Sequence, residues 1–189
     1  MINFQGDTEL EIIITDSAKK RWEIPKNEPF LNPDRKKLEI KDLKYDVKIG
    51  SSPFFLKVSR KSSKKAIFST ENLQFLFTDR YLEISTHLQT KHIFGIGESN
   101  KFFVLENGTY TIWTRDFPFK MGWGRPGFNT YGHHPVFLGK EEDKNGFYLV
   151  YFRNSNAMDM IFSDEEKLNK WTITYKTIGG ILNFKIFLC

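Results

Sequence analysis

The chain has 189 residues, of which 40% are hydrophobic and 16% aromatic, enough apolar material for one domain with a sizeable core. This composition excludes a disordered chain. The 28 Lys and Arg residues and 23 Asp and Glu residues leave a net charge of +5, but the basic residues are scattered and no nucleic-acid-binding motif is present. The densest basic run, residues 60–65, is expected to be a solvated hairpin tip, so we predict no nucleic-acid partner.

The sequence predicts no disulfide, membrane span or targeting address. Its single cysteine is Cys189, the last residue, so cysteine usage does not identify a compartment. Residues 1–10 lack the basic region and apolar core of a signal peptide. The longest apolar run is far shorter than the ~18 residues of a membrane-spanning helix.

Alternating apolar and polar residues predict strands through the first half of the chain, at 9–14, 54–59, 66–68, 73–77, 81–85 and 93–96. Residues 25–48 are polar and contain three prolines, which predicts an irregular connection with one short strand at 38–40. The glycines at 95 and 97 indicate a strand bend or a close backbone approach. Residues 107–109 (NGT) fit both a tight turn and a glycosylation sequon, and we favour the turn.

The second half shows the same pattern, with strands predicted at 109–114, 136–138, 147–152, 158–162, 171–176 and 182–188. Residues 147–152 are continuously apolar, as in a strand covered on both faces. Turns or loops are expected at 143–146 and 164–166, and a long loop rich in glycine, proline and aromatics at 117–130. Short strands at regular spacing, with no helical period, predict an all-β sandwich or barrel with little helix.

No catalytic residue can be assigned from the spacing of carboxylates. Glycoside hydrolysis usually needs two carboxylates facing each other across a sugar. Pairs exist, such as Asp116 with Glu98 and Asp143 with Asp159, but sequence alone places none of them at the required separation.

No metal or cofactor site is predicted either. His133 and His134 are adjacent, so in a strand they point to opposite faces and cannot easily chelate one ion. Gly95 and Gly97 lack the third glycine and the following helix of a dinucleotide site. A nucleophile-elbow motif is absent from the sequence.

The remaining candidate is the Arg115-Asp116 pair at the start of the long loop. An aspartate accepts two hydrogen bonds, which suits vicinal sugar hydroxyls, and nearby aromatic residues offer apolar faces for sugar rings: Trp113, Phe117, Phe119, Trp123 and Phe128. The competing interpretation is an Arg–Asp ion pair that orders a loop whose aromatics pack inward.

Several sequence words resemble the N-terminal domain of glycoside hydrolase family 31, the α-glucosidase, maltase-glucoamylase and sucrase-isomaltase family. They occur in order and span nearly the whole chain: 21–25 (RWEIP), 81–85 (YLEIS), 95–98 (GIGE), 109–116 (TYTIWTRD), 131–135 (YGHHP), 154–159 (NSNAMD) and 177–188 (TIGGILNFKIFL). The resemblance implies one domain over residues 1–189 with a galactose-mutarotase-like β-sandwich (supersandwich) fold.

The resemblance also implies a role for the Arg-Asp pair and a partner domain. In this family a (β/α)₈ barrel carries the aspartate nucleophile and the acid/base aspartate of a retaining mechanism, and neither barrel motif is in this sequence. The position of Asp116 is that of a family residue that contacts the bound sugar, with Arg115 as its neighbour. The implied partners are an α-glucoside or oligosaccharide substrate and the catalytic barrel. The family suggests a lysosomal or secretory location.

We therefore expect a fragment or truncated product of an α-glucosidase-like enzyme, inactive alone because the catalytic carboxylates are missing. The last predicted strand runs directly to Cys189, as though more polypeptide should follow. The alternatives are a standalone non-catalytic carbohydrate-binding sandwich and a structural partner of a separate barrel chain.

Overall fold

A computed structural model describes residues 1–25, 41–99, 103–116, 129–141, 146–165 and 170–189. Every regular element within these ranges is a β-strand, which confirms the all-β prediction. The strands are β1 (Ile2–Phe4), β2 (Glu9–Ile14), β3 (Tyr45–Ser51), β4 (Phe54–Arg60), β5 (Ala66–Ser69), β6 (Phe75–Phe77), β7 (Leu82–Leu88), β8 (Ile93–Ser99), β9 (Gly108–Ile112), β10 (Asn129–Lys140), β11 (Phe147–Phe152), β12 (Met158–Glu165), β13 (Lys170–Thr177) and β14 (Leu182–Leu188).

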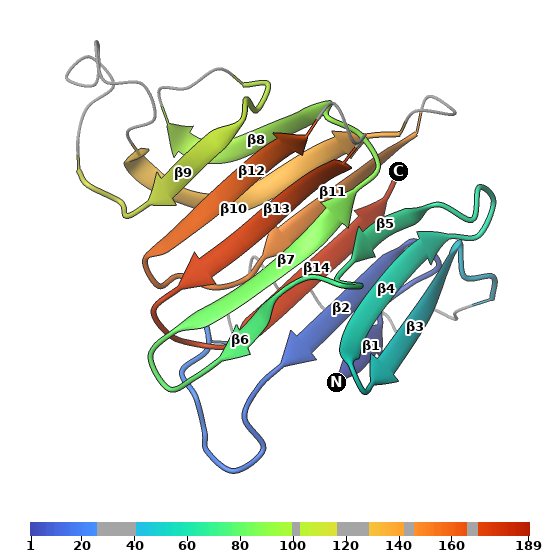
Figure 1. The fold of residues 1–189 in the computed structure, drawn as a ribbon, viewed down its shortest axis with the longest axis horizontal. Helices are drawn as coiled ribbons and strands as arrows, with labels where there is room; N and C mark the ends of the chain where they lie inside the picture. Colours follow the sequence, from blue (N-terminus) through green and yellow to red (C-terminus); the bar gives the residue numbers. More distant parts are fainter. Residues whose placement is uncertain (26–40, 100–102, 117–128, 142–145, 166–169) are drawn as a thin grey trace.

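The strands form two antiparallel sheets. Sheet A has the order β1-β2-β14-β11-β10-β8, and sheet B has the order β3-β4-β5-β7-β13-β12-β9, with β6 pairing β7. Figure 1 shows the two sheets stacked face to face, with β7, β12 and β13 of sheet B lying over β10, β11 and β14 of sheet A. This is a β-sandwich, in which each sheet buries one face against the other.

The prediction of an irregular connection up to about residue 48 is wrong at its end, because β3 begins at Tyr45. Strand β3 lies at the edge of sheet B, where β4 is its partner among the described strands, so most of its side chains reach solvent. Tyr45 anchors it: the ring is 1% exposed and the hydroxyl donates to the carbonyl oxygen of Glu9 at 2.8 Å. The strand predicted at 38–40 lies outside the described residues.

Strand β1 was not predicted, and several other boundaries differ from the prediction. Strand β10 spans twelve residues instead of 136–138, because register shifts against β8 between Asn129 and Phe137 break the alternation that a regular strand would show. The backbone of β12 stays paired with β13 through residue 165, where a loop was expected. The chain bends at Asn107 to cross from β8 in sheet A to β9 in sheet B, so this Asn-Gly is not the hairpin turn we predicted.

Other expectations are confirmed. Residues 61–65 form the tip of the β4–β5 hairpin, closed by the hydrogen bond from the Arg60 amide to the Lys65 carbonyl oxygen at 3.0 Å. A Cβ on Gly95 would lie 2.7 Å from the Val136 carbonyl oxygen, which is the close backbone approach expected of that glycine. The turn predicted at 143–146 falls mostly outside the described residues.

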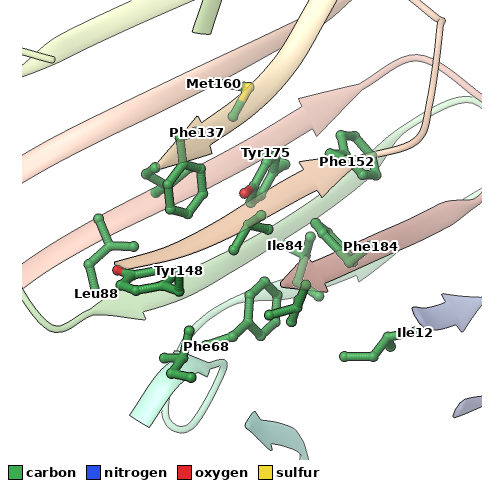
Figure 2. Close-up of a cluster of buried hydrophobic side chains, with 14 of the residues drawn as sticks. Ile12, Phe68, Ile84, Leu88, Phe137, Tyr148, Phe152, Met160, Tyr175 and Phe184 are labelled. Atoms are coloured by element: carbon green, nitrogen blue, oxygen red, sulfur yellow. The ribbon is translucent and has the colours of Figure 1, made fainter. Parts of the chain in front are cut away.

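Aromatic side chains fill the space between the sheets (Figure 2). Phe184 of sheet A stacks on Phe152 at a centroid distance of 4.8 Å and contacts Tyr175 and Phe68 of sheet B, each at 5.1 Å. All four rings are fully buried. Their position between the layers explains why alternating apolar residues were the strongest signal in the sequence.

The outer face of sheet A carries a row of apolar side chains, which we call the outer stripe. Strand register aligns one residue from each of four neighbouring strands, and each is half-buried: Phe94, Leu138, Leu149 and Phe187. Phe103, 72% exposed, packs on Phe94 with ring centroids 5.7 Å apart. Strand β11 is therefore fully buried on one face only, whereas its composition had predicted cover on both.

An ion pair joins the two sheets at one end of the sandwich. Arg60, at the end of β4, donates from Nε to the Glu141 carboxylate oxygens at 2.8 and 3.0 Å, and from Nη2 to the carbonyl oxygens of Phe147 and Cys189 at 3.2 and 3.3 Å. The Glu141 side chain is 7% exposed and that of Arg60 16% exposed. The arginine thus fixes a sheet B hairpin to the ends of sheet A strands.

Candidate functional site

The candidate site begins where β9 ends and the chain turns sharply outward. Thr114 and Asp116 have φ values of 45° and 56°. Positive φ is uncommon for any residue with a Cβ and is an outlier for a β-branched residue such as threonine. The turn brings Arg115 and Asp116 to the surface, where both are exposed.

Asn129 holds this turn in place with four hydrogen bonds. Its Oδ1 accepts from the backbone N–H groups of Trp113, at 2.8 Å, and of Thr114. Its Nδ2 donates to the carbonyl oxygens of Glu98 and Gly132, each at 2.7 Å. The side chain is 2% exposed and uses its full hydrogen-bonding capacity, so it ties the ends of β8, β9 and β10 together.

Backbone and carboxylate contacts support the same turn. The Arg115 amide donates to the Thr130 carbonyl oxygen at 2.9 Å. Glu98, on β8, accepts from the Gly132 amide at 3.0 Å through Oε2, and this hydrogen bond holds the pKa of the Glu98 carboxyl below its usual value. Glu98 therefore acts as an ionised acceptor for β10 backbone beside the site.

A second asparagine orders the opposite side of the site. Asn154, 3% exposed, donates from Nδ2 to the carbonyl oxygens of Gly179 and Ile181 at 2.9 and 3.0 Å. Its Oδ1 accepts from the backbone and side-chain N–H groups of Asn156 at 2.8 and 2.9 Å. Gly180 has φ 76°, and a Cβ there would lie 2.8 Å from Asn154 Nδ2, so the glycine lets the two loops interlock.

Between these two asparagine-held segments lies a hollow of about 300 Å³, which we call the first hollow. It is lined by residues from the turn, from β10 and from the two loops: Trp113, Thr114, His133, Ser155, Ala157 and Ile178. Trp113 is 56% exposed and Ile178 58% exposed, so both present apolar surface. The hollow combines an aromatic wall with polar groups, the usual composition of a small-molecule site.

The predicted site residues lie beside the first hollow and do not line it. Arg115 and Asp116 follow Thr114 in the chain, at the surface. The four loop aromatics of the sugar-face hypothesis at 117, 119, 123 and 128, together with Asp143, lie outside the described residues. Trp113 is the member of that aromatic set whose position the structure gives, and it does line the hollow.

The two adjacent histidines diverge as expected for strand neighbours. His133 lies 3.3 Å from the Asn156 carbonyl oxygen through Nε2, whereas His134 lies beside Gly132 and Glu98. Among the residues that the structure describes, no group of three or more His, Cys, Asp or Glu side chains is arranged to hold a metal ion.

Sequence reasoning missed the two buried asparagines that shape the site. Asn154 begins the word 154–159 used for the resemblance, and Asn129 lies two residues before the word 131–135. An asparagine beside apolar strand residues is a signal for a side chain that bonds to backbone, since a buried amide needs partners.

Comparison with known proteins identifies a family. Residues 5–160 match the model of the glycosyl hydrolase 31 N-terminal galactose mutarotase-like domain. The chain is 34% identical to the lysosomal acid alpha-glucosidase of Tetrahymena pyriformis over 184 residues, covering 95% of this chain and 19% of that protein. It is also 34% identical to human intestinal sucrase-isomaltase over 192 residues, covering 99% of this chain and 10% of that protein.

The fold comparison agrees. A glycosyl hydrolase 31 dextranase from Flavobacterium johnsoniae, complexed with glucose, superposes with a TM-score of 0.72 at 15% identity, covering 100% of this chain and 23% of that chain. This likeness concerns the fold. The chain thus spans between about a tenth and a quarter of these three proteins. No helix in the described ranges is long and apolar enough to cross a membrane.

Proposed function

Because the chain belongs to the family of glycosyl hydrolase 31 N-terminal galactose mutarotase-like domains, we propose that it is the sugar-contacting, non-catalytic domain of an α-glucoside-hydrolysing enzyme. In this proposal Arg115 and Asp116 contact the substrate. The two catalytic carboxylates come from a (β/α)₈ barrel outside this sequence, and residues 1–189 act as one domain. The small share of each relative that the chain spans supports this division of labour.

The observation that carries the proposal is the turn at residues 114–116. Left-handed φ values at Thr114 and Asp116 are costly, of order 1–3 kcal/mol each, and such strain persists only when surrounding contacts enforce it. Asn129 supplies those contacts with four hydrogen bonds. Hydrogen bonds that hold a strained turn, and with it an exposed aspartate beside the first hollow, suggest that this aspartate contacts a ligand.

The chemistry of Asp116 suits a sugar. Two carboxylate oxygens accept from two neighbouring hydroxyls, and hydrogen bonds to a charged acceptor contribute about 1.5–3 kcal/mol each. Retaining hydrolysis needs two carboxyl groups only ~5–5.5 Å apart at the scissile bond. Asp116 would hold the sugar ring while those groups react, so its binding energy would serve to orient the substrate.

The outer stripe on sheet A supports the idea that another domain, of the same chain or of a separate one, packs against this face. A row of four apolar side chains, extended by Phe103 at 72% exposure, is an unusual surface for a domain that stands alone in water. A larger assembly would cover such a surface.

A domain exchange tests the proposal. In the chimera, this chain replaces the matching segment of the α-glucosidase of Mucor javanicus, to which it is 34% identical over 190 residues. In that chimera we expect Asp116→Ala to lower kcat/KM for maltose by about 10- to 100-fold, the loss of one or two charge-assisted hydrogen bonds. Glu106→Ala, at another exposed carboxylate, is the control and should change nothing. Equal kcat/KM for the Asp116→Ala chimera and its parent would contradict the proposal, as would hydrolysis of maltose by the isolated chain at enzyme-like rates.

A second candidate is a standalone carbohydrate-binding sandwich, favoured by the exposure of Trp113. In that case the isolated chain should bind maltose without any barrel, and Asp116→Ala should weaken the affinity. Titration followed by tryptophan fluorescence measures this. Absence of binding at millimolar maltose would remove this candidate and leave the domain role intact.

A further inference from the structure

A second hollow, of about 290 Å³, lies on the outer face of sheet B, on the other side of Trp113 and Ile178. Trp113, Ala157 and Ile178 line both hollows, so the two adjoin. The polar residues that line the second hollow come from β9, β12 and β13 of sheet B and from the residue before β7: Tyr81, Thr111, Asp159, Lys176 and Thr177.

Strand register builds the floor of this second hollow. Asp159 of β12 lies between Thr111 of β9 and Lys176 of β13, and Lys176 pairs in turn with Glu83 of β7. Cross-strand neighbours on one face are close enough to interact, so these four side chains form one polar row across four strands. Such a floor is fixed by the sheet and does not depend on loop conformation.

Contacts within the row hold its charges in position. Thr111 donates through Oγ1 to Asp159 Oδ1 at 2.6 Å. Lys176 Nζ lies 3.7 Å from Glu83 Oε2, which also accepts from the Tyr81 hydroxyl. An ammonium has three donors and a carboxylate about four acceptor positions, so Lys176 and Asp159 retain capacity for an external ligand.

The charges of the row decide which ligand class fits. The charged residues that line the hollow are Asp159 and Lys176, and Glu83 lies beyond the lining, beside Lys176, so a phosphate or other anion would meet the Asp159 carboxylate and an ammonium already paired with Glu83. A purely apolar ligand would not use the hydrogen-bonding positions that Asp159 and Lys176 retain beyond their contacts with Thr111 and Glu83. A neutral polyhydroxyl compound with one apolar face satisfies both the polar row and the indole of Trp113, which is 56% exposed.

We propose that the second hollow is an outer sugar subsite, in which a pyranose ring stacks on Trp113 and its hydroxyls bond to Asp159 and Lys176. An oligosaccharide would then extend from beside Asp116, past Trp113, into the second hollow. This inference rests on the proposed function for the direction of the chain, but its residues are separate from Arg115 and Asp116. Its consequence is a preference for longer α-glucans over the disaccharide.

The test is a titration of the chain with maltose, maltotriose and maltopentaose, followed by tryptophan fluorescence and calorimetry. We expect the affinity to rise at least tenfold from maltose to maltopentaose. Lys176→Met removes the three donors and keeps an unbranched side chain. It should lower the affinity for maltopentaose about tenfold and leave the affinity for maltose unchanged. Asp159→Asn retains an acceptor for Thr111 and provides a second, milder variant.

Controls separate this inference from the proposed function. Ser163→Ala, on the same strand and face but four residues from Asp159, should leave all affinities unchanged. Asp116→Ala should weaken maltose and maltopentaose alike. If Asp116→Ala has no effect while Lys176→Met lowers maltopentaose affinity, the proposed role of Asp116 fails and the outer subsite stands. Equal affinity for all three sugars, no binding of maltopentaose at millimolar concentration, or full affinity in both Lys176→Met and Asp159→Asn would overturn the subsite.

Discussion

Replacing Asn129 by alanine should destabilise the domain more than any exposed change near the site. The substitution removes four hydrogen bonds from a side chain that is 2% exposed. It leaves two backbone donors and two backbone acceptors without their partner. A buried polar group left unsatisfied costs about 1–3 kcal/mol, but the turn can relax and admit water, so we expect a total loss of about 4 kcal/mol.

The assay is equilibrium denaturation in urea, with hydrogen exchange as a local readout. A loss of this size should lower the thermal midpoint by about 10 °C in a domain of this length. The amide protons of Trp113 and Thr114 should lose protection in the variant, because Asn129 Oδ1 is their acceptor. Asn3 lies on the edge strand β1 and makes one side-chain hydrogen bond to Glu11. Asn3→Ala is therefore the matched control and should lower the free energy of unfolding by less than about 1 kcal/mol.

A third variant, Asn129→Asp, separates the accepted bonds from the donated ones. The introduced carboxyl keeps an acceptor for the two amides but sets negative charge against the carbonyl oxygens of Glu98 and Gly132. Its folded pKa should therefore lie above the unfolded value of about 3.9, so stability relative to the parent is greatest below that pH and falls as pH rises through the folded pKa. For Asn129→Ala, a loss of less than about 1 kcal/mol in the free energy of unfolding, or unchanged hydrogen exchange at the amides of Trp113 and Thr114, would refute the role of Asn129 in holding the turn.

Three further predictions follow from other parts of the structure. Arg60→Met should lower the free energy of unfolding, measured by urea denaturation, by about 3 kcal/mol, because it leaves the Glu141 carboxylate, 7% exposed, without its guanidinium partner. A change near zero would mean that water replaces the arginine as the partner of Glu141. Burial raises the pKa of Tyr45 to about 12, and the hydrogen bond to Glu83 raises the pKa of Tyr81 to about 12. Stability should therefore be intact below pH ~10 and fall as pH rises towards 12. Thermal midpoints and tyrosinate absorbance should change together, and ionisation of all tyrosines well before unfolding would contradict this prediction. Leu149→Lys, in the outer stripe, should reduce self-association of the isolated chain in light scattering and lower the thermal midpoint only slightly, because this half-buried side chain lies on the outer face of sheet A and outside the core. Equal association of both proteins would show that the stripe is not the contact surface.

Strand positions were predictable wherever one face of a strand is buried. In β14, Phe184, Ile186 and Leu188 alternate with the less buried Lys185 and Phe187, and the sequence shows that period directly. Strand β3 was not predicted although Tyr45, Val47 and Ile49 alternate with polar residues or glycine; the polar, proline-containing segment before it was extended through residue 48. The bulged pairing of β10 with β8 hid the first half of β10.

The candidate site was predictable only in part, because its shape depends on contacts between distant segments. Arg115 and Asp116 were chosen from their chemistry and from the family resemblance. The left-handed backbone at Thr114 is held by a hydrogen bond to Asn129, fifteen residues away, and no local sequence pattern connects the two. The polar row beneath the second hollow likewise requires the register of four strands, which period-two alternation does not specify.

The place of β14 in sheet A has a consequence for how the chain folds during synthesis. Strand β14 lies between β2 and β11, and its register pairs Leu10 with Ile186, so β2 must wait for about 170 further residues to leave the ribosome. At ~5–20 residues per second this delay is roughly ten to thirty seconds. A two-stranded β1–β2 hairpin is marginal in water, and the edge of β2 that later pairs with β14 stays unpaired through that interval. The nascent chain should therefore depend on a chaperone that shields its first strands until the last one is made.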